Sequence, residues 1–87
     1  MPAETEANAA LDLIAEDAFK AGPKWQAAHQ ITQRHEGEPL FDAIHAFLHR
    51  IEGDTSNAAY WDRRAGTDFG KYGPEDELSA LRDFVRR

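Results

Sequence analysis

Apolar residues recur at helical spacing along this chain, most clearly between residues 39 and 51. If Pro39 opens a helix there, six apolar side chains fall on one arc roughly 120° wide at about 100° per residue. They are Leu40, Phe41, Ile44, Phe47, Leu48 and Ile51. This arc predicts a helix face that packs into a core. Gly53 is expected to end the helix, because glycine adopts the left-handed conformation that closes a last turn without a side-chain clash.

A second helix is expected to begin directly after that glycine. Asp54 can cap it, because its carboxylate can accept hydrogen bonds from the amides of the first turn. The helix should run from Thr55 to Ala65 and stop at Gly66. One of its faces carries Ala58, Trp61 and Ala65. A stop and a start in neighbouring residues predict a central antiparallel helical hairpin over residues 39–66.

Three further stretches predict helices on either side of this hairpin. The first should begin at Thr5, behind a frayed end at residues 1–4. Its apolar stripe comprises Ala7, Ala10, Leu11, Ile14, Ala18 and Phe19. The second should run from Lys24 to His35 with a narrow, polar face, and the last should open at Pro74 with an acidic first turn. The chain is therefore predicted to be a single all-α domain over residues 1–87, a small bundle or orthogonal array of about five short helices.

The segment 67–73 contains two glycines and two aromatic residues, which is typical of a turn-rich loop and not of a strand. Phe69 and Tyr72 could pin this loop to the hairpin, or could form an exposed binding edge. Pinning is favoured, because aromatic side chains in the loops of so small a domain usually add to the core.

Length and charge narrow the classes of protein to which the chain could belong. Eighty-seven residues are near the size at which a single core only just offsets the ordering entropy, so a partner chain could add stability. The formal net charge of -6 argues against nucleic-acid binding, which normally needs a basic stripe. The absence of cysteine removes disulfides and thiolate metal sites. No membrane span or secretory signal is apparent, so we expect a cytoplasmic protein without membrane contact.

Histidines supply the cluster of side chains with the greatest chemical capability. On the central helix, His45, His49 and Glu52 follow at i, i+4 and i+7 along the border of the apolar arc. Two imidazoles at that spacing can converge on a divalent metal such as zinc. Glu52 could complete or orient the ligand set, and His29 could arrive from the preceding helix. Alternatively, these side chains cover the edge of the core and hydrogen-bond between helices, with His29 half-buried and stacked on Trp25.

Arginines follow the same hairpin. Arg50, Arg63 and Arg64 could hold a carboxylate or phosphate ligand, or they could pair internally. Internal pairing is favoured because acidic residues outnumber basic ones by 16 to 10. The expected pairs join Arg50 to Asp54 or Glu52, and Arg63 or Arg64 to Asp62, Asp68 or the acidic first helix.

The run from His45 to Gly66 resembles the signature of a group of small helical proteins, mostly bacterial, to which no activity is assigned. The positions that carry the resemblance are His45, His49, Arg50, Glu52, Gly53, Asp54, Asn57, Ala58, Tyr60, Trp61, Arg63, Arg64, Ala65 and Gly66. The resemblance implies a helical domain with no catalytic residues to carry over. The hairpin is also similar to a single tetratricopeptide-type repeat, with Ala46, Ala58 and Ala65 at its small positions.

No catalytic signature accompanies these features. The sequence has no serine in a recognisable nucleophile turn and no glycine-rich phosphate cradle, so we do not expect an enzyme. We expect a non-enzymatic helical module that acts through protein contacts, with a protein partner or a second copy of itself. The alternative is a protein that binds a metal or a small ligand through His45, His49 and Glu52.

Overall fold

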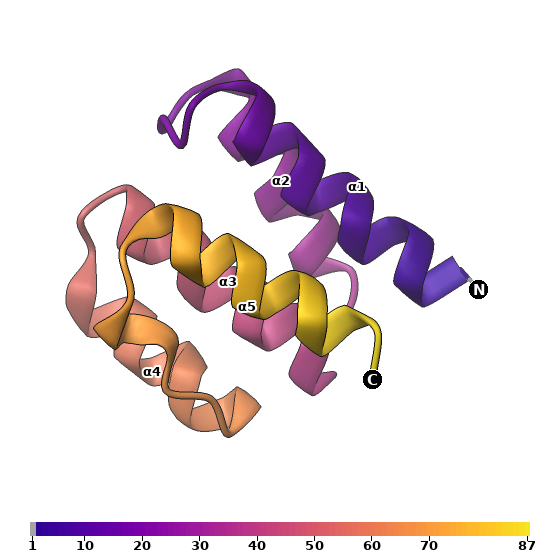
Figure 1. Ribbon diagram of the computed structural model, residues 1–87, viewed down its shortest axis with the longest axis vertical. Coiled ribbons are helices and arrows are strands. Elements are labelled where there is room, and N and C mark those ends of the chain that lie inside the picture. The colour runs from indigo at the N-terminus through magenta and orange to yellow at the C-terminus, as the bar shows by residue number, and fades with distance from the viewer. Residues whose placement is uncertain (1) are drawn as a thin grey trace.

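The computed structural model of the chain describes residues 2–87, which form five α-helices joined by short turns (Figure 1). In chain order these are α1 (Pro2–Glu16), α2 (Pro23–Gln33), α3 (Pro39–Ile51), α4 (Thr55–Ala65) and α5 (Pro74–Val85), with a 3₁₀ turn, η1 (Phe69–Lys71), before the last. The described residues contain no strand, so the predicted small all-α bundle is confirmed. None of the helices in this part of the chain has both the length and the apolar character needed to span a bilayer.

Helix α3 is the centre of the bundle, because α1, α2, α4 and α5 all pack against it. Figure 1 shows α1 and α5 running beside each other on the near face, with α3 behind them. Every residue from Phe41 to His49 is buried. This is more than the amphipathic pattern predicts, because neighbouring helices cover the polar border of α3 as well as its apolar arc.

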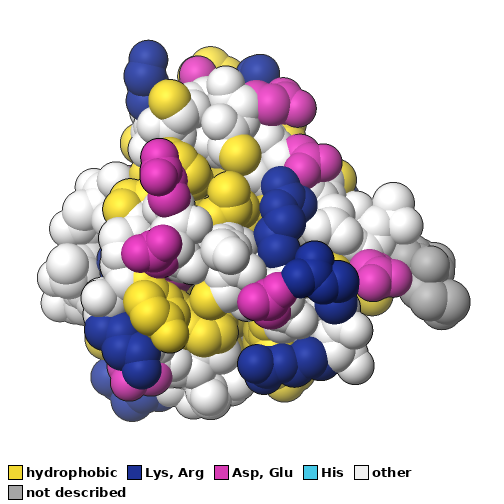
Figure 2. Space-filling view, viewed as in Figure 1, with side chains coloured by type: hydrophobic (Ala, Val, Ile, Leu, Met, Phe, Trp, Pro, Cys, Tyr) yellow, Lys and Arg dark blue, Asp and Glu magenta, His cyan; other side chains and the backbone are white. Residues whose placement is uncertain are grey.

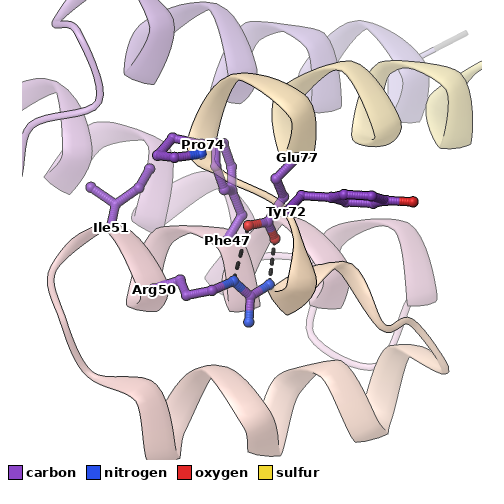
Figure 3. Close-up of a pocket in the computed structure, with 6 residues that line it drawn as sticks. All are labelled: Phe47, Arg50, Ile51, Tyr72, Pro74 and Glu77. Atoms are coloured by element: carbon purple, nitrogen blue, oxygen red, sulfur yellow. Dashed lines mark hydrogen bonds and ion pairs between the residues drawn. The ribbon is translucent and has the colours of Figure 1, made fainter.

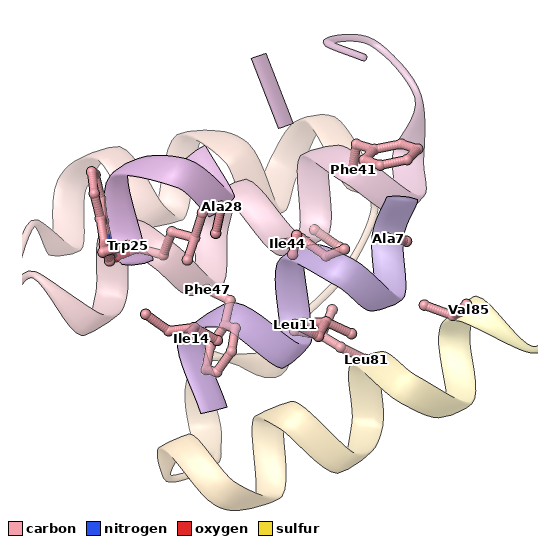
Figure 4. Close-up of a cluster of buried hydrophobic side chains, with 13 residues drawn as sticks. Ala7, Leu11, Ile14, Trp25, Ala28, Phe41, Ile44, Phe47, Leu81 and Val85 are labelled. Atoms are coloured by element: carbon pink, nitrogen blue, oxygen red, sulfur yellow. Dashed lines mark hydrogen bonds between the residues drawn. The ribbon is translucent and has the colours of Figure 1, made fainter. Parts of the chain in front are cut away.

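Side chains from four helices meet in one hydrophobic core (Figure 4). Its largest fully buried apolar members are Leu11, Ile14, Phe41, Ile44, Phe47, Leu48 and Leu81. Removing a side chain of this size from water contributes about 1.5–3 kcal/mol. These residues come from α1, α3 and α5, and α2 adds Trp25 and Ala28. The core therefore fixes α2 and α3 side by side, and the candidate site lies between these two helices.

The predicted hairpin of α3 and α4 is present, and the turn has the expected chemistry. Gly53 has a φ of 88°, and its conformation lets the amide of Asp54 donate to the carbonyl of His49 at 2.9 Å. The Asp54 side chain caps α4 by accepting from the Asn57 amide at 3.2 Å. Gly66 ends α4 in the left-handed conformation. This turn brings Asp54 back beside the last turn of α3.

Helix α1 begins earlier than predicted. It starts at Pro2 and not at Thr5, so residues 2–4 of the expected frayed end belong to the helix. Met1, which also belonged to that expected frayed end, lies outside the described residues. Proline is well tolerated in a first helical turn, because the amide that it lacks would have no intrahelical partner there.

The same helix ends earlier than its apolar stripe suggests. It stops at Glu16, and both Ala18 and Phe19 have positive φ angles, of 54° and 60°. Ala18 is consequently exposed, while the Phe19 ring packs edge-on against Phe47 at 6.2 Å. Periodicity alone cannot indicate such a turn, because residues other than glycine adopt positive φ only where surrounding contacts hold them there.

The segment after α4 is a short 3₁₀ turn, consistent with the predicted loop. Phe69 is half-buried and packs edge-on against Phe84 of α5 at 6.3 Å. Tyr72 is 40% exposed. Phe69 therefore pins this loop to the bundle, and its aromatic partner outside the loop, Phe84, lies on α5.

Candidate metal centre

Three histidine side chains converge at the interface of α2 and α3. His45 and His49 lie one turn apart on α3, and their rings stack with centroids 4.7 Å apart. His29 of α2 meets both rings nearly perpendicularly, with its centroid 4.7 Å from His45 and 5.3 Å from His49. One nitrogen of each ring can be chosen so that all three lie within 4.8 Å of one another. The cluster therefore presents three converging nitrogen donors.

Two of these nitrogens are nearly as far apart as two nitrogen ligands of the same metal ion would be. The Nε2 atoms of His29 and His45 are 3.0 Å apart. Two nitrogens bound to one tetrahedral zinc at about 2.05 Å each would lie about 3.3 Å apart. A movement of a few tenths of an ångström would therefore let both nitrogens bind one ion. In the absence of an ion, one Nε2 must donate its proton to the other, because two bare lone pairs at this separation would repel.

Glu52 lies behind the His49 ring and is not placed to bind the same ion as the three imidazoles. Its Oε2 lies 2.7 Å from His49 Nδ1, where it accepts a hydrogen bond, so His49 keeps its lone pair on Nε2. The imidazole ring then stands between the carboxylate and any ion on Nε2. The residues brought together as ligand candidates are His29, His45 and His49. Glu52 orients the His49 ring and fixes its tautomer, as carboxylates behind metal-bound imidazoles do.

Two tryptophans form walls of this cluster. Trp25 stacks on His29 with centroids 4.8 Å apart, so the stacking expected from their spacing is confirmed. The Trp25 indole donates to the Leu48 carbonyl at 2.7 Å, which ties α2 directly to α3. Trp61 of α4 stacks on His45 at 3.9 Å. The imidazoles are consequently held by ring stacking on two sides.

Burial keeps the imidazoles of His29 and His45 neutral. Desolvation, followed by the charges of His29, His49 and Arg64, lowers the pKa of His45 to about 3. Desolvation also lowers the pKa of His29, with the charge of His49 as a second cause. Metals bind the neutral form of imidazole, so protons compete weakly for these nitrogens near neutral pH. The buried Nδ1 of His45 has no hydrogen-bond partner among residues 2–87, so stacking orients that ring.

Arg50 lies outside the cluster, in a buried ion pair. Its Nε and Nη2 donate to the two carboxylate oxygens of Glu77, and its Nη1 donates to Asp62 at 2.9 Å. The predicted pairing with Asp54 or Glu52 is wrong, because α5 packs on α3 and brings Glu77 to the guanidinium from 27 residues away. Burial disfavours the charge of Arg50, but the hydrogen bonds to Glu77 and Asp62 outweigh burial and raise its pKa.

A cavity of about 190 Å³ lies beside this ion pair (Figure 3). It is lined by Phe47, Arg50, Ile51, Tyr72, Pro74 and Glu77. Figure 3 shows the guanidinium and carboxylate pointing toward each other, with apolar side chains around them. The cavity is smaller than most small-molecule sites, and its charged groups already satisfy one another. It therefore offers a ligand less free chemistry than the imidazoles do.

The other arginines of the hairpin reach the surface of α4. Arg64 donates to the Tyr60 hydroxyl at 3.1 Å, and its guanidinium lies 4.9 Å from the Trp61 ring centroid. Its nearest acid is Asp42, with Nε 4.0 Å from Oδ2, instead of one of the acids expected from sequence. Arg63 is exposed.

The surface has no single-sign patch on the face that α1 and α5 form. Figure 2 shows basic and acidic side chains intermingled there, with small hydrophobic areas between them. No histidine is visible on this face, consistent with the buried positions of His45 and His49.

Two participants were not anticipated from the sequence. The contact of Trp61 with His45 was not among the expectations, and Glu77 was expected only as part of the acidic first turn of the helix that opens at Pro74. The spacing of Ala58, Trp61 and Ala65 places the indole toward α3, because small residues on both sides let the helices approach, but it does not indicate that the ring meets His45. No local signal indicates the partner of Glu77.

Comparison of the chain with known protein families, with curated proteins and with solved structures finds no match. The resemblance of residues 45–66 to a group of small bacterial helical proteins therefore stays a prediction.

Proposed function

We propose that this protein binds one divalent transition-metal ion, with zinc as the best-fitting ion, through the imidazoles of His29, His45 and His49. The observation that carries the proposal is the 3.0 Å separation of the His29 and His45 Nε2 atoms, with the His49 ring in the same group. A simple interhelical hydrogen bond between two imidazoles accounts for that distance. It does not account for the third ring or for the carboxylate that leaves a lone pair on its inner nitrogen.

The donor set favours particular ions. Neutral imidazole suits zinc, copper and nickel, whereas calcium and magnesium require oxygen ligands. The absence of cysteine removes the thiolate ligands that favour copper(I). Three imidazoles supply three of the four positions around tetrahedral zinc and leave the fourth to water or another ligand.

The ion would act as a clasp between two helices. His29 belongs to α2, whereas His45 and His49 belong to α3. A ligand that binds only the folded state stabilises it by about 2.7 kcal/mol when present at 100 times its dissociation constant. For a domain of this size such a gain corresponds to roughly 10–20 °C in Tm. The role proposed is therefore structural, and no reaction is assigned.

The test is a zinc titration of tag-free protein purified without chelator. We expect calorimetry to give one site per chain, and differential scanning calorimetry to show a higher Tm with zinc. Cobalt(II) should give the intense visible bands of a tetrahedral centre. Absence of binding heat together with an unchanged Tm would overturn the proposal.

Histidine substitutions provide the matched comparison. His29→Gln and His49→Gln each remove one donor and should weaken zinc binding by at least about 100-fold, since each removes one of three ligands. Glu52→Gln should weaken binding by about 10–100-fold, because it changes only the support that holds the His49 ring in place. His35→Gln is the control, because the fourth histidine lies outside the cluster, and its affinity should equal that of the unmodified chain.

A different observation favours a second candidate function. Tyr60 and Tyr72 are 44% and 40% exposed, whereas the remaining Phe and Trp side chains are buried or half-buried. Tyrosine is enriched in protein interfaces. Under this proposal the α4 and η1 edge contacts a protein partner or a second copy of the chain in the cytoplasm. Sedimentation at increasing concentration tests the homodimer: Tyr60→Ser should weaken the self-association, and strictly monomeric behaviour would count against it.

A further inference from the structure

The rest of the protein covers most of the imidazole cluster and shields it from solvent. His45 and His49 are 3% and 6% exposed, whereas His29 is only half-buried and Glu52 is exposed. The edge of His29 and the carboxylate of Glu52 therefore mark the side on which the cluster approaches solvent.

The turn after α3 places a second carboxylate on this side. The amide of Asp54 donates to the carbonyl of His49, and this bond folds the chain back over the end of α3. Ligand atoms of His49, Glu52 and Asp54 consequently lie within 4.8 Å of one another. His49 thus belongs both to this outer group and to the three-imidazole cluster. It is a deeply buried imidazole that connects the two exposed acids to the interior donors.

We propose that Glu52 and Asp54 capture the hydrated metal ion at the surface and deliver it to His29, His45 and His49. This inference rests on the proposed function, because it concerns how the same site is filled. The independent sign of a ligand on the inner side is the convergence of three imidazoles, with the Nε2 atoms of His29 and His45 only 3.0 Å apart.

The two carboxylates and the three imidazoles bind metal ions differently, as capture followed by delivery requires. Carboxylate oxygens attract a hydrated cation at long range and can hold it while it keeps most of its water. Capture there needs no proton transfer, because the His49 proton can stay on Nδ1 in its bond to Glu52. Imidazoles bind zinc more strongly but only after water is lost. An ion held by the acids is therefore kept near the cluster during that slower exchange.

Asp54 is the residue that tests this inference cleanly. Asp54→Asn removes the charge, while asparagine caps a helix as well as aspartate does, so α4 should remain intact. Glu75→Gln is the matched control, because it makes the same change in net charge at an exposed position in the first turn of α5. The measurement is stopped-flow quenching of tryptophan fluorescence by Co²⁺, since Trp25 and Trp61 both stack on cluster histidines.

We expect Asp54→Asn to reduce the association rate constant about three- to ten-fold at low salt, and the difference to shrink near 0.5 M salt. The dissociation rate constant should not rise, whereas damage to the inner site would raise it. Glu75→Gln should leave both rate constants unchanged. An unchanged association rate in Asp54→Asn, or an equal reduction in Glu75→Gln, would overturn this inference alone. Failure of the unmodified chain to bind Co²⁺ and zinc would instead overturn the proposed function.

Discussion

At the scale of single residues, the buried ion pair of Arg50 and Glu77 makes the loss of its cation costly. The Glu77 side chain is 2% exposed, and both of its carboxylate oxygens accept from the guanidinium. Arg50→Met leaves this carboxylate inside the protein without a cation. We therefore expect the free energy of unfolding, measured by urea denaturation at pH 7, to fall by about 3 kcal/mol.

The matched control for that loss is the double variant Arg50→Met/Glu77→Leu. It replaces the ion pair by apolar side chains of similar size, and only Asp62, which is 14% exposed, keeps an unpaired charge. Such replacements are often close to neutral, so we expect the double variant to recover more than half of the loss. If it unfolds as easily as Arg50→Met, then lost packing explains the effect and the stranded charge does not.

A second prediction at this scale concerns His35. Its Nδ1 lies 3.0 Å from Glu38 and its Nε2 lies 3.2 Å from Glu6, and these hydrogen bonds, that to Glu38 first, raise its pKa above 6.5. A pKa raised by folding stabilises the protein fully below the unfolded value, and the stabilisation is lost as pH rises through the folded value. His35→Gln should therefore lower Tm more at about pH 5.5 than at about pH 8.

The comparison in that experiment is the Tm difference between the two proteins at each pH. Because His29 and His45 are present in both, their own response to acid cancels. A difference that is equal at both pH values would mean that His35 contributes through its stacking on Phe41, at 4.1 Å, and not through its charge.

The donors of the site and the stacking of Trp25 on His29 could be predicted from the sequence, but the contact of Trp61 with His45 and the choice of Glu52 between two roles could not. The i and i+4 spacing of His45 and His49 follows from helix geometry alone, and Trp25 lies one turn before His29 for the same reason. The place of Glu52 depends on the rotamer that it adopts at the helix end. The spacing allows its i, i+3 bond to His49 but does not favour that bond over direct binding of an ion, whereas the stacking of Trp61 on His45 depends on the packing of α4 against α3.

At the scale of elements, the α3–α4 turn depends on one backbone conformation. Gly53 has φ 88°, and a Cβ there would meet no atom within 4 Å, so the cost of a side chain is conformational and not steric crowding. Gly53→Ala should lower the free energy of unfolding by about 1 kcal/mol. Gly53→Asn should cost less than half as much, because asparagine tolerates the left-handed region. Equal losses in urea denaturation would contradict this explanation.

The helix ends were predictable where the chain uses strong local signals. Pro39 and Gly53 bracket α3, and Asp54 and Gly66 bracket α4, each through a conformational preference that needs no tertiary contact. The end of α1 was missed because Phe19 turns away to reach Phe47, which no nearby residue indicates. Local chemistry therefore fixed the hairpin, whereas core contacts fixed the turn that follows α1.

At the scale of the whole molecule, the candidate site joins two parts of the bundle. The α1 and α2 helices pair with each other, and α3 pairs with α4 through the hairpin. The imidazole of His29 belongs to the first pair, while His45 and His49 belong to the second. An ion bound by all three should therefore resist the separation of α2 from α3 more than it resists fraying elsewhere.

Hydrogen exchange can measure this difference directly. Amides of α2 that exchange by local opening should slow by up to about 100-fold when zinc is present at 100 times its dissociation constant, because that opening must release the ion. The last turn of α5, which contains none of the ligand candidates, should exchange at the same rate with and without zinc. His29→Gln should abolish the protection of α2, since α2 then supplies no donor. Protection of equal size in all five helices would mean that zinc stabilises the bundle only against global unfolding, and that the two helix pairs never separate on their own.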